Sequence, residues 1–260
     1  MPQAKPLALQ LCPFSDYLQA GLGQRLELVR WFELDGQGQG GVALDQVRVV
    51  VTGGHLGCAP ALMQALPALG LIAINGVGFD KVDLSLAAAR GVAVCNTPDV
   101  LTEDVADLAV GLIIAQLRGI SAGDAFVRSG AWAAGEMPLG RKVSGKRFGV
   151  LGLGRIGHAV AERLAPFGPV GYFARAPKDA PFEHFATPTA LAQWADVLVV
   201  ATAANAETAG LVDAALLTVL GPQGLLVNVA RGSVVDEAAL VAALADGRLG
   251  AAALDVFADE

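Results

Sequence analysis

The stretch that decides the fold of this chain runs from Arg147 to Leu164 and reads "RFGVLGLGRIGHAVAERL". Gly152, Gly154 and Gly157 form the pattern GxGxxG, directly after an apolar run typical of a strand and at the opening of a helical pattern. In this context the first glycine permits a tight turn, the second lets a pyrophosphate approach the backbone, and the third lets helix and strand pack closely. The stretch therefore predicts a dinucleotide-binding loop, with the diphosphate at the helix N-terminus.

The next apolar run indicates which dinucleotide the loop binds. A site for NAD places Asp or Glu at the end of this strand, where the acid holds the ribose hydroxyls. Here the run reads "VGYFARAPK", with Arg175 and Lys178 and no acid. A guanidinium binds a 2′-phosphate through charge-assisted hydrogen bonds, whereas a carboxylate would repel it. We therefore predict NADPH rather than NADH, bound by Arg175 with Arg155 and Ile156 of the loop; the alternative is that Arg175 lies over the adenine ring or in solvent.

Outward from this loop, short apolar runs alternate with segments of helical period along the whole chain. Ten runs are typical of strands: "LALQL", "LVRWF", "VRVVV", "LIAIN", "VAVCN", "RFGVL", "VGYFA", "VLVVA", "GLLVNVA" and "AAALDV". This alternation predicts a parallel α/β fold, and ten strands are too many for one small sheet. The prediction is two doubly wound, Rossmann-like parallel-sheet domains, with the boundary near Asn96: residues 1–96 and 97–260.

The alternation breaks once, between Thr97 and Gly145. Thr102 is predicted to cap a long apolar helix whose first turn carries Glu103 and Asp104, where negative charge is favourable. A second helix, 121–128, and a Gly-rich arm, 130–145, follow. These two helices are predicted to lead into the second domain.

Composition excludes several classes of protein. The chain has 260 residues, 54% of them hydrophobic, and a formal net charge of −7, so it can fill a core but offers no basic face for nucleic acid. No segment is long and apolar enough to span a membrane, and the N-terminus has no export signal, which predicts a cytoplasmic protein. Three cysteines without CxxC spacing predict reduced, buried thiols and no metal site.

The three histidines carry no clear catalytic pattern. His158 lies roughly opposite the apolar stripe of its helix, so a solvated position is expected. His184 is expected in a loop without a partner. His55, in "TGGHLG", is expected near the end of a strand, where a substrate passes in some α/β proteins.

Four longer motifs carry a resemblance to a known family: "NTPDVLTEDVADLAVGLIIAQLR", "GKRFGVLGLGRIG", "NVARGSVVDEAAL" and "GRLGAAALDVFADE". Together they resemble the D-isomer-specific 2-hydroxyacid dehydrogenases, most closely their glyoxylate/hydroxypyruvate and hydroxyphenylpyruvate reductase branch. The resemblance covers nearly the whole chain. It implies a flavodoxin-like substrate domain first, a dinucleotide-binding domain second, and a homodimer.

The resemblance also implies roles for single residues. Arg231 matches the arginine that grips the substrate carboxylate and polarises the keto oxygen. Glu260 matches the acid that pairs with the catalytic histidine, and Asp255 the residue that orients the nicotinamide carboxamide. Val77 and Gly78, in "NGVGFDKVD", match the loop that receives the substrate carboxylate; the alternative is an ordinary turn capped by Asp80.

Two positions are less well defined by the resemblance. Trp132, in "SGAWAAGEMPLG", matches a tryptophan that reaches toward the substrate pocket of the other subunit, with dimer packing as the alternative. At Ala203 and Ala204 relatives often carry proline, so the shape of this cofactor-side loop is open.

The family's histidine lies beyond its "DVFxxE" motif, and none of the three histidines here has the matching context. The sequence is therefore expected to be a truncated chain. The predicted function is hydride transfer from NADPH to a small 2-keto acid, glyoxylate or hydroxypyruvate, to give the D-2-hydroxy acid. The alternative is a dinucleotide-binding corepressor-like sensor or an inactive pseudoenzyme of the same fold.

Overall fold

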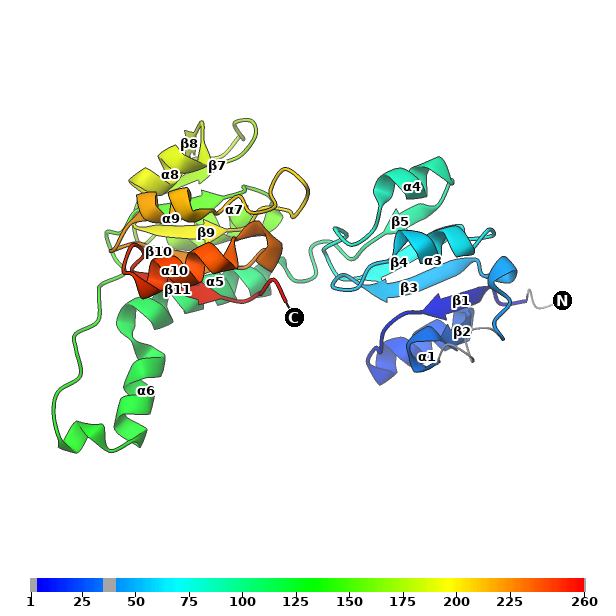
Figure 1. The fold of residues 1–260 in the computed structure, drawn as a ribbon, viewed down its shortest axis with the longest axis horizontal. Coiled ribbons are helices and arrows are strands. Elements are labelled where there is room, and N and C mark those ends of the chain that lie inside the picture. Colours follow the sequence, from blue (N-terminus) through cyan, green and yellow to red (C-terminus); the bar gives the residue numbers. More distant parts are fainter. Residues whose placement is uncertain (1–3, 35–40, 260) are drawn as a thin grey trace. The chain divides into compact units, whose positions relative to one another are not determined.

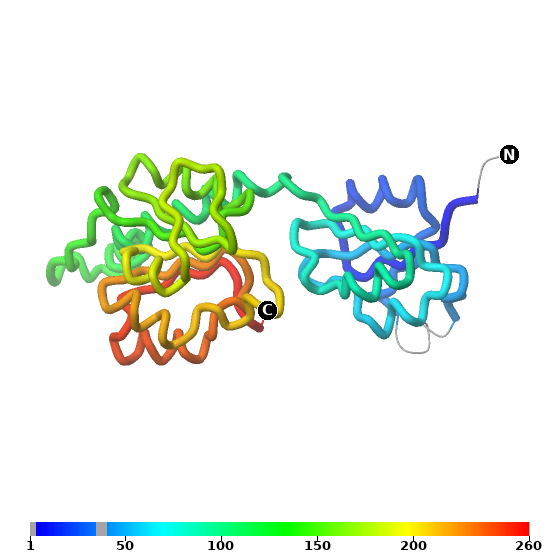
Figure 2. The backbone as a smooth tube through the Cα atoms, turned by 90° about the horizontal axis from the view of Figure 1, so that it is seen from above, coloured from blue at the N-terminus to red at the C-terminus, as the bar shows by residue number. Residues whose placement is uncertain are grey.

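The structure is a computed structural model that describes residues 4–34 and 41–259. The chain divides into two compact units, residues 1–100 (unit 1) and 101–260 (unit 2). Figure 2 follows the backbone as it passes once from unit 1 into unit 2. The sequence placed this boundary near Asn96, and the contacts divide the chain after Val100.

Unit 1 is built on one parallel sheet of five strands in the order β2-β1-β3-β4-β5. Its elements are β1 (Leu7–Gln10), α1 (Asp16–Arg25), β2 (Glu27–Arg30), η1 (Trp31–Glu33), η2 (Leu44–Gln46), β3 (Val49–Gly53), α3 (Pro60–Ala65), β4 (Leu71–Asn75), α4 (Leu84–Ala89) and β5 (Ala93–Cys95). This 2-1-3-4-5 order is the flavodoxin-like order, as expected. Buried Leu9 and Ala8 point to opposite faces, so each face of the sheet has its own apolar cluster.

Unit 2 is built on a parallel sheet of six strands in the order β11-β10-β9-β6-β7-β8. Its elements are α5 (Thr102–Arg118), α6 (Ile120–Arg128), η3 (Ala131–Ala133), β6 (Phe148–Leu151), α7 (Arg155–Leu164), β7 (Val170–Phe173), β8 (Glu183–Phe185), α8 (Pro188–Trp194), β9 (Val197–Val200), α9 (Ala214–Leu220), β10 (Leu225–Asn228), η4 (Gly232–Val234), α10 (Glu237–Ala245) and β11 (Ala251–Leu254). Counted from β6, the order is 3-2-1-4-5-6, that of the dinucleotide-binding Rossmann fold. The doubly wound α/β prediction is confirmed.

Side-chain alternation along the strands separates the two helical layers of unit 2 (Figure 1). Val197 and Val199 of β9 face a cluster that includes α5 and α7, while Leu198 and Val200 face a cluster that includes α8, α9 and α10. Because successive side chains of a strand point to opposite faces, nearly continuous apolar runs are required to bury both. Figure 1 also shows α6 and the arm after it projecting away from this sheet.

Three local predictions were wrong. The described residues form eleven strands, whereas ten were predicted. The strand that was not predicted is β8, whose short "EHF" lacks an apolar run. Leu101, not Thr102, is the N-cap residue of α5, and Thr102 is already helical. The second helix starts at Ile120, because Gly119 adopts a left-handed conformation (φ 64°) that ends α5 and starts α6.

No single helix in the described ranges is both long and apolar enough to cross a membrane. The bent pair α5 and α6, with 55° between its members, passes the same criteria of length and composition when the two are taken together.

Candidate functional site at the carboxyl edge of the unit 2 sheet

The three loop glycines after β6 have three different surroundings. Gly152 has φ +98°, a conformation that side chains rarely adopt, and a Cβ there would lie 2.7 Å from the Cα of Thr202. A Cβ on Gly157 would lie 1.9 Å from the main-chain oxygen of Gly152, so helix α7 packs directly on the turn. A Cβ on Gly154 would meet nothing within 4 Å. The first and third glycines are thus required by packing, whereas the second borders open space.

The open space at Gly154 lies at the N-terminus of α7. Gly154 is the N-cap residue, and its carbonyl accepts the first helical hydrogen bond, from His158 N at 2.9 Å. The first turn of a helix leaves main-chain N–H groups without helical partners, and the helix dipole favours an anion there. Exposed Arg155 and half-buried Ile156 form this turn. The loop therefore fits the diphosphate of a dinucleotide.

Arg175 follows β7 in a loop that the neighbouring residues hold in place. The main-chain N–H of Lys178 donates to the hydroxyl of buried Tyr172 at 2.7 Å. A ring nitrogen of His184, Nε2, lies 3.0 Å from the carbonyl oxygen of Ala174. These contacts hold the backbone on both sides of Arg175, whose side chain extends into solvent.

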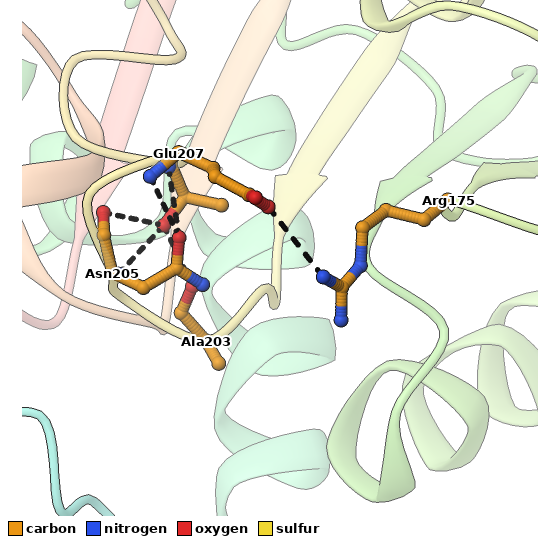
Figure 3. Close-up of polar contacts among 5 residues, drawn as sticks. Arg175, Ala203, Asn205 and Glu207 are labelled. Atoms are coloured by element: carbon orange, nitrogen blue, oxygen red, sulfur yellow. Dashed lines mark hydrogen bonds and ion pairs between the residues drawn. The ribbon is translucent and has the colours of Figure 1, made fainter. Parts of the chain in front are cut away.

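The loop after β9 closes on its own side chains (Figure 3). The side-chain oxygen of Asn205 accepts from the N–H groups of Glu207 at 2.8 Å and Thr208 at 3.2 Å. The Thr208 hydroxyl donates to the carbonyl of Ala203 at 2.8 Å. The Glu207 carboxylate lies 3.5 Å from Nη1 of Arg175. The sequence left the shape of this loop open at Ala203 and Ala204, and the hydrogen bonds of Asn205 and Thr208 give it a defined shape.

Arg231 lies three residues after the end of β10, and the last residue of that strand holds its turn. The side-chain amide of Asn228, only 1% exposed, donates to the carbonyl of Arg231 at 3.0 Å. The Asn228 side-chain oxygen accepts from the N–H of Ala230 at 3.0 Å. The guanidinium of Arg231 donates to the carbonyl of Ala230 at 2.7 Å. The turn that presents Arg231 is therefore closed by side-chain hydrogen bonds.

Asp255 follows β11 and lies beside the same turn. Its N–H donates to the carbonyl of Asn228 at 2.9 Å. A Cβ on Gly232 would lie 1.9 Å from the carbonyl carbon of Phe257, so the two backbones are in direct contact. These contacts bring the chain after β11 against the Arg231 turn.

The acidic segment after Asp255 is also held by α10. The N–H of Ala258 donates to a side-chain oxygen of Glu237, the first residue of α10, at 2.6 Å. Glu260, predicted to be the partner of the catalytic histidine, lies outside the described residues.

In unit 1 the Val77–Gly78 loop follows β4. Asn96 donates from its side-chain amide to the carbonyl of Val77 at 2.7 Å, and Thr97 exchanges two hydrogen bonds of 3.0 Å with Gly76. The following helix, α4, is capped by Asp83, whose carboxylate accepts from Leu86 N, so the alternative of a cap at Asp80 was wrong.

The histidines show one difference from expectation. His184 lies in β8, where it contacts Ala174 and the ring of Tyr172, so the prediction of a loop residue without a partner was wrong. His158 is half-exposed on α7 beside Glu162 and Phe182. His55 lies exposed in the turn after β3.

The cysteines were predicted to be buried, which was wrong for one of them. Cys12 and Cys58 are buried, whereas Cys95 is exposed because it lies on the edge strand β5. Residues 4–34 and 41–259 contain no cluster of three or more His, Cys, Asp or Glu suited to a metal ion.

Unit 2 thus gathers most of the predicted site residues at the carboxyl ends of the strands of one sheet. The glycine loop, Arg175, Arg231 and Asp255 follow β6, β7, β10 and β11, at the sheet edge where open α/β folds bind ligands. Asn228 and Glu207 were not among the residues predicted from the sequence. A polar residue at the end of the apolar run "GLLVN" is the signal that could have identified Asn228.

Comparison with known proteins identifies the family. Residues 110–260 match the family described as "D-isomer specific 2-hydroxyacid dehydrogenase, NAD binding domain". The chain belongs to the D-isomer-specific 2-hydroxyacid dehydrogenases. This dehydrogenase is an oxidoreductase, and its glycine loop lies in a nicotinamide dinucleotide-binding unit.

Individual relatives cover nearly the whole chain. This dehydrogenase is 46% identical over 256 residues to the hydroxyphenylpyruvate reductase of Plectranthus scutellarioides, a match of 97% of this chain and 82% of that protein. It is 44% identical over 258 residues to a glyoxylate/hydroxypyruvate reductase of Arabidopsis thaliana, with the same coverage, 97% and 82%.

Solved structures agree with the sequence relatives. The 2-hydroxyacid dehydrogenase of Ketogulonicigenium vulgare is 48% identical with a TM-score of 0.90, over 99% of this chain and 83% of that one. The NADPH-dependent glyoxylate/hydroxypyruvate reductase of Sinorhizobium meliloti, solved with NADP and malonate, is 38% identical with a TM-score of 0.90, over 99% and 81% of the two chains.

Proposed function

We propose that this dehydrogenase reduces small 2-keto acids, glyoxylate and hydroxypyruvate first, to D-2-hydroxy acids with NADPH as the reductant. The observation that carries the proposal is the Arg231 turn, held at the same sheet edge as the dinucleotide loop and in contact with the Asp255 segment. The names of the relatives support this substrate class. No comparison favours the alternative of a dinucleotide-binding sensor or pseudoenzyme.

Different residues of this chain bind the cofactor and the substrate, orient the nicotinamide and stabilise the charge that develops on the substrate. The nicotinamide supplies a hydride when it is bound. The glycine loop and the first turn of α7, with Arg155 and Ile156, hold the diphosphate through main-chain N–H groups. Asp255 orients the nicotinamide carboxamide.

The planar guanidinium of Arg231 binds the substrate carboxylate and stabilises negative charge on the keto oxygen. In unit 1, the main-chain N–H groups of Val77 and Gly78 are our candidates for carboxylate binding.

The proton for the new hydroxyl is assigned to none of the three histidines. His158 and His184 are engaged with neighbours in unit 2, and His55 stands outside the family's sequence context. Glu260 remains the predicted partner of the catalytic histidine. A carboxylate next to imidazole raises its pKa, which suits a proton donor.

The preference for NADPH rests on Arg175. The guanidinium at the end of β7 takes the place where an NAD site carries an acid, and a 2′-phosphate would receive charge-assisted hydrogen bonds from it. Hydrogen bonds to charged groups contribute about 1.5–3 kcal/mol, so Arg175→Ala should weaken NADPH binding roughly tenfold to a hundredfold while NADH binding changes little.

A homodimer is the expected assembly. Trp132 in η3 is 65% exposed and contacts only the edge of Phe126 among aromatic rings of the described chain, on the arm that projects from unit 2 in Figure 1. An exposed tryptophan on such an arm is consistent with dimer packing or with contact to a partner's site.

The cytoplasmic location stays a prediction from the sequence.

Two measurements test the proposal. Glyoxylate- and hydroxypyruvate-dependent oxidation of NADPH by the full-length protein should proceed faster than oxidation of NADH. Dissociation constants of both cofactors, measured on wild type and Arg175→Ala, should show the selective loss for NADPH. Absence of turnover together with intact cofactor binding would overturn the reductase, and an unchanged ratio of the two constants would overturn the cofactor preference.

A further inference from the structure

The ion pair between Arg175 and Glu207 spans the dinucleotide loop. Arg175 follows β7 and Glu207 follows β9, while β6, which carries the glycine loop at its end, lies between these two strands in the sheet. The Arg175 Nη1 and a Glu207 carboxylate oxygen are 3.5 Å apart (Figure 3). The guanidinium predicted to receive the cofactor's 2′-phosphate therefore already has an anionic neighbour in the protein.

The loop structure directs the Glu207 carboxylate toward this position. Asn205 accepts hydrogen bonds from the N–H groups of Glu207 and Thr208, and Thr208 in turn bonds the main chain of Ala203 and Asn205. Such a turn, closed by an Asn side chain and a Thr hydroxyl, restricts the backbone of the residues within it. The contact with Arg175 thus joins two loops whose backbones are both held by local hydrogen bonds.

Exposure keeps the pair accessible to a ligand. The side chains of Arg175 and Glu207 are 86% and 72% exposed. Exposed ion pairs are weak, about 0.2–1 kcal/mol, because water solvates both charges. A bound phosphate could therefore replace the carboxylate on the guanidinium without breaking a buried contact.

The 2′-phosphate of NADPH and the Glu207 carboxylate differ in how strongly they bind the Arg175 guanidinium. A phosphate monoester carries roughly −1.5 to −2 charges near neutral pH, more than a carboxylate, and offers three acceptor oxygens to the guanidinium. NADPH has this group on its adenosine ribose and NADH does not. A carboxylate at Glu207 opposes only the cofactor that carries the phosphate, because it occupies the phosphate's partner and repels the same charge.

We propose that Glu207 is a specificity-determining residue that competes with the 2′-phosphate of NADPH for Arg175 and so limits the preference for NADPH over NADH. This inference rests on the proposed role of Arg175 in binding that phosphate. It assigns to the loop after β9 a part in cofactor selection, in addition to the loop after β7.

The test is the binding of NADP⁺ and NAD⁺ to the whole chain, measured by calorimetry, for wild type and Glu207→Gln. Glutamine keeps the size of the side chain and removes its charge. Loss of an exposed ion pair predicts NADP⁺ binding that is roughly 1.5- to 5-fold tighter, with NAD⁺ binding unchanged. The gain should be largest at about 0.01 M salt and vanish near about 1 M, where exposed charges are screened.

The matched control is Glu136→Gln. Glu136 is also exposed and also on unit 2, but it lies on the arm after η3 and outside the loops at the carboxyl edge of the sheet. This variant removes the same charge from the protein, so it reports any effect of net charge alone. It should leave both dissociation constants unchanged.

The double variant Arg175→Ala/Glu207→Gln tests whether Glu207 competes with the phosphate for Arg175 or only repels the phosphate through its negative charge. If Glu207 acts through Arg175, most of the gain for NADP⁺ disappears in the Arg175→Ala background. An equal change for both cofactors, no change, or weaker NADP⁺ binding in Glu207→Gln would overturn the inference. Failure of the underlying cofactor assignment has a different signature: Arg175→Ala alone would then leave the ratio of the NADP⁺ and NAD⁺ constants unchanged.

Discussion

The side-chain amide of Asn228 donates a hydrogen bond of 3.0 Å to the main-chain carbonyl of Arg231, and this contact ties the end of β10 to the turn that presents the guanidinium. Asn228 also accepts from Asp255 N through its own carbonyl at 2.9 Å. One buried residue therefore bonds to both segments proposed to act on substrate and cofactor. Side-chain hydrogen bonds of this kind define a turn more tightly than backbone preference alone.

Asn228→Ala is expected to weaken the binding of a substrate-like carboxylate. The change leaves the N–H of Ala230 and the carbonyl of Arg231 without the Asn228 side chain as their partner. Each buried polar group that loses its hydrogen bond costs about 1–3 kcal/mol of stability, and the Arg231 turn is no longer held in one conformation. The dissociation constant of oxalate, measured by calorimetry with cofactor present, should rise by roughly tenfold.

Leu226→Ala is the control for this experiment. Leu226 is fully buried in the same strand, and its truncation costs about 2–5 kcal/mol without touching the turn. Asn228→Asp should recover part of the binding, because its carboxylate still accepts from Ala230 N. If Leu226→Ala weakens oxalate binding as much as Asn228→Ala does, Asn228 has only a structural role.

Gly154→Ala and Gly157→Ala should separate ligand binding from folding. The Gly157 Cβ would lie 1.9 Å from the oxygen of Gly152, so this variant should lose about 1–3 kcal/mol of stability and bind cofactor poorly. The Gly154 Cβ meets open space, so its stability should change by less than about 0.5 kcal/mol.

Gly154→Ala should nevertheless bind NADPH roughly tenfold more weakly, because the new methyl group lies where the diphosphate approaches. Thermal unfolding without ligand and fluorescence titration with NADPH measure the two effects. Normal NADPH affinity in Gly154→Ala would contradict the placement of the diphosphate.

Asp196 is expected to stabilise the folded chain in a pH-dependent way. Burial raises the pKa of this carboxyl, but hydrogen bonds from the main-chain N–H and guanidinium of Arg147 and its positive charge outweigh burial, so the pKa lies below its ordinary value. A depressed pKa contributes stability that is present above the unfolded pKa of about 3.9 and is lost as pH falls through the folded pKa.

Asp196→Asn should therefore lower the free energy of unfolding at pH 7 by about 1 kcal/mol. Below about pH 4 the difference from wild type should begin to shrink, because the unfolded chain then takes up a proton, and it should disappear once the pH falls below the depressed pKa of the folded state. Urea unfolding at several pH values measures this, with Glu183→Gln as the control. A difference that stays constant down to acid pH would show that charge is not the cause.

Cys95 should react with iodoacetamide before the other two thiols in the native protein. Burial raises the pKa of Cys58 to about 11, and it also raises the pKa of Cys12 despite a hydrogen bond from the Gly53 backbone. The thiolate is the nucleophile, so both buried thiols should stay largely unmodified near pH 8, while exposed Cys95 is accessible. Mass spectrometry of the peptides measures the order, and rapid labelling of Cys58 would contradict the buried position.

The sequence by itself determined the fold class and the position of the dinucleotide loop. Strands buried on both faces must be nearly continuous apolar runs. The turn after β6 and the first turn of α7 require glycine at positions 152 and 157, because a Cβ at either would collide with the backbone. These constraints act within a few residues of one another, so they can be recognised without the tertiary structure. The edge strand β8 was not predicted, because a partly exposed edge strand needs no apolar run.

Only the tertiary structure decided which distant residues meet. Arg175 and Glu207 are 32 positions apart, and they approach because β7 and β9 flank β6 in the sheet. Asn228 meets Asp255 because β10 and β11 are parallel neighbours in register. Strand order is set by packing of whole layers, and no local pattern in the sequence specifies which loops lie side by side. The contacts that position Arg231 and oppose Arg175 therefore became visible only with the fold.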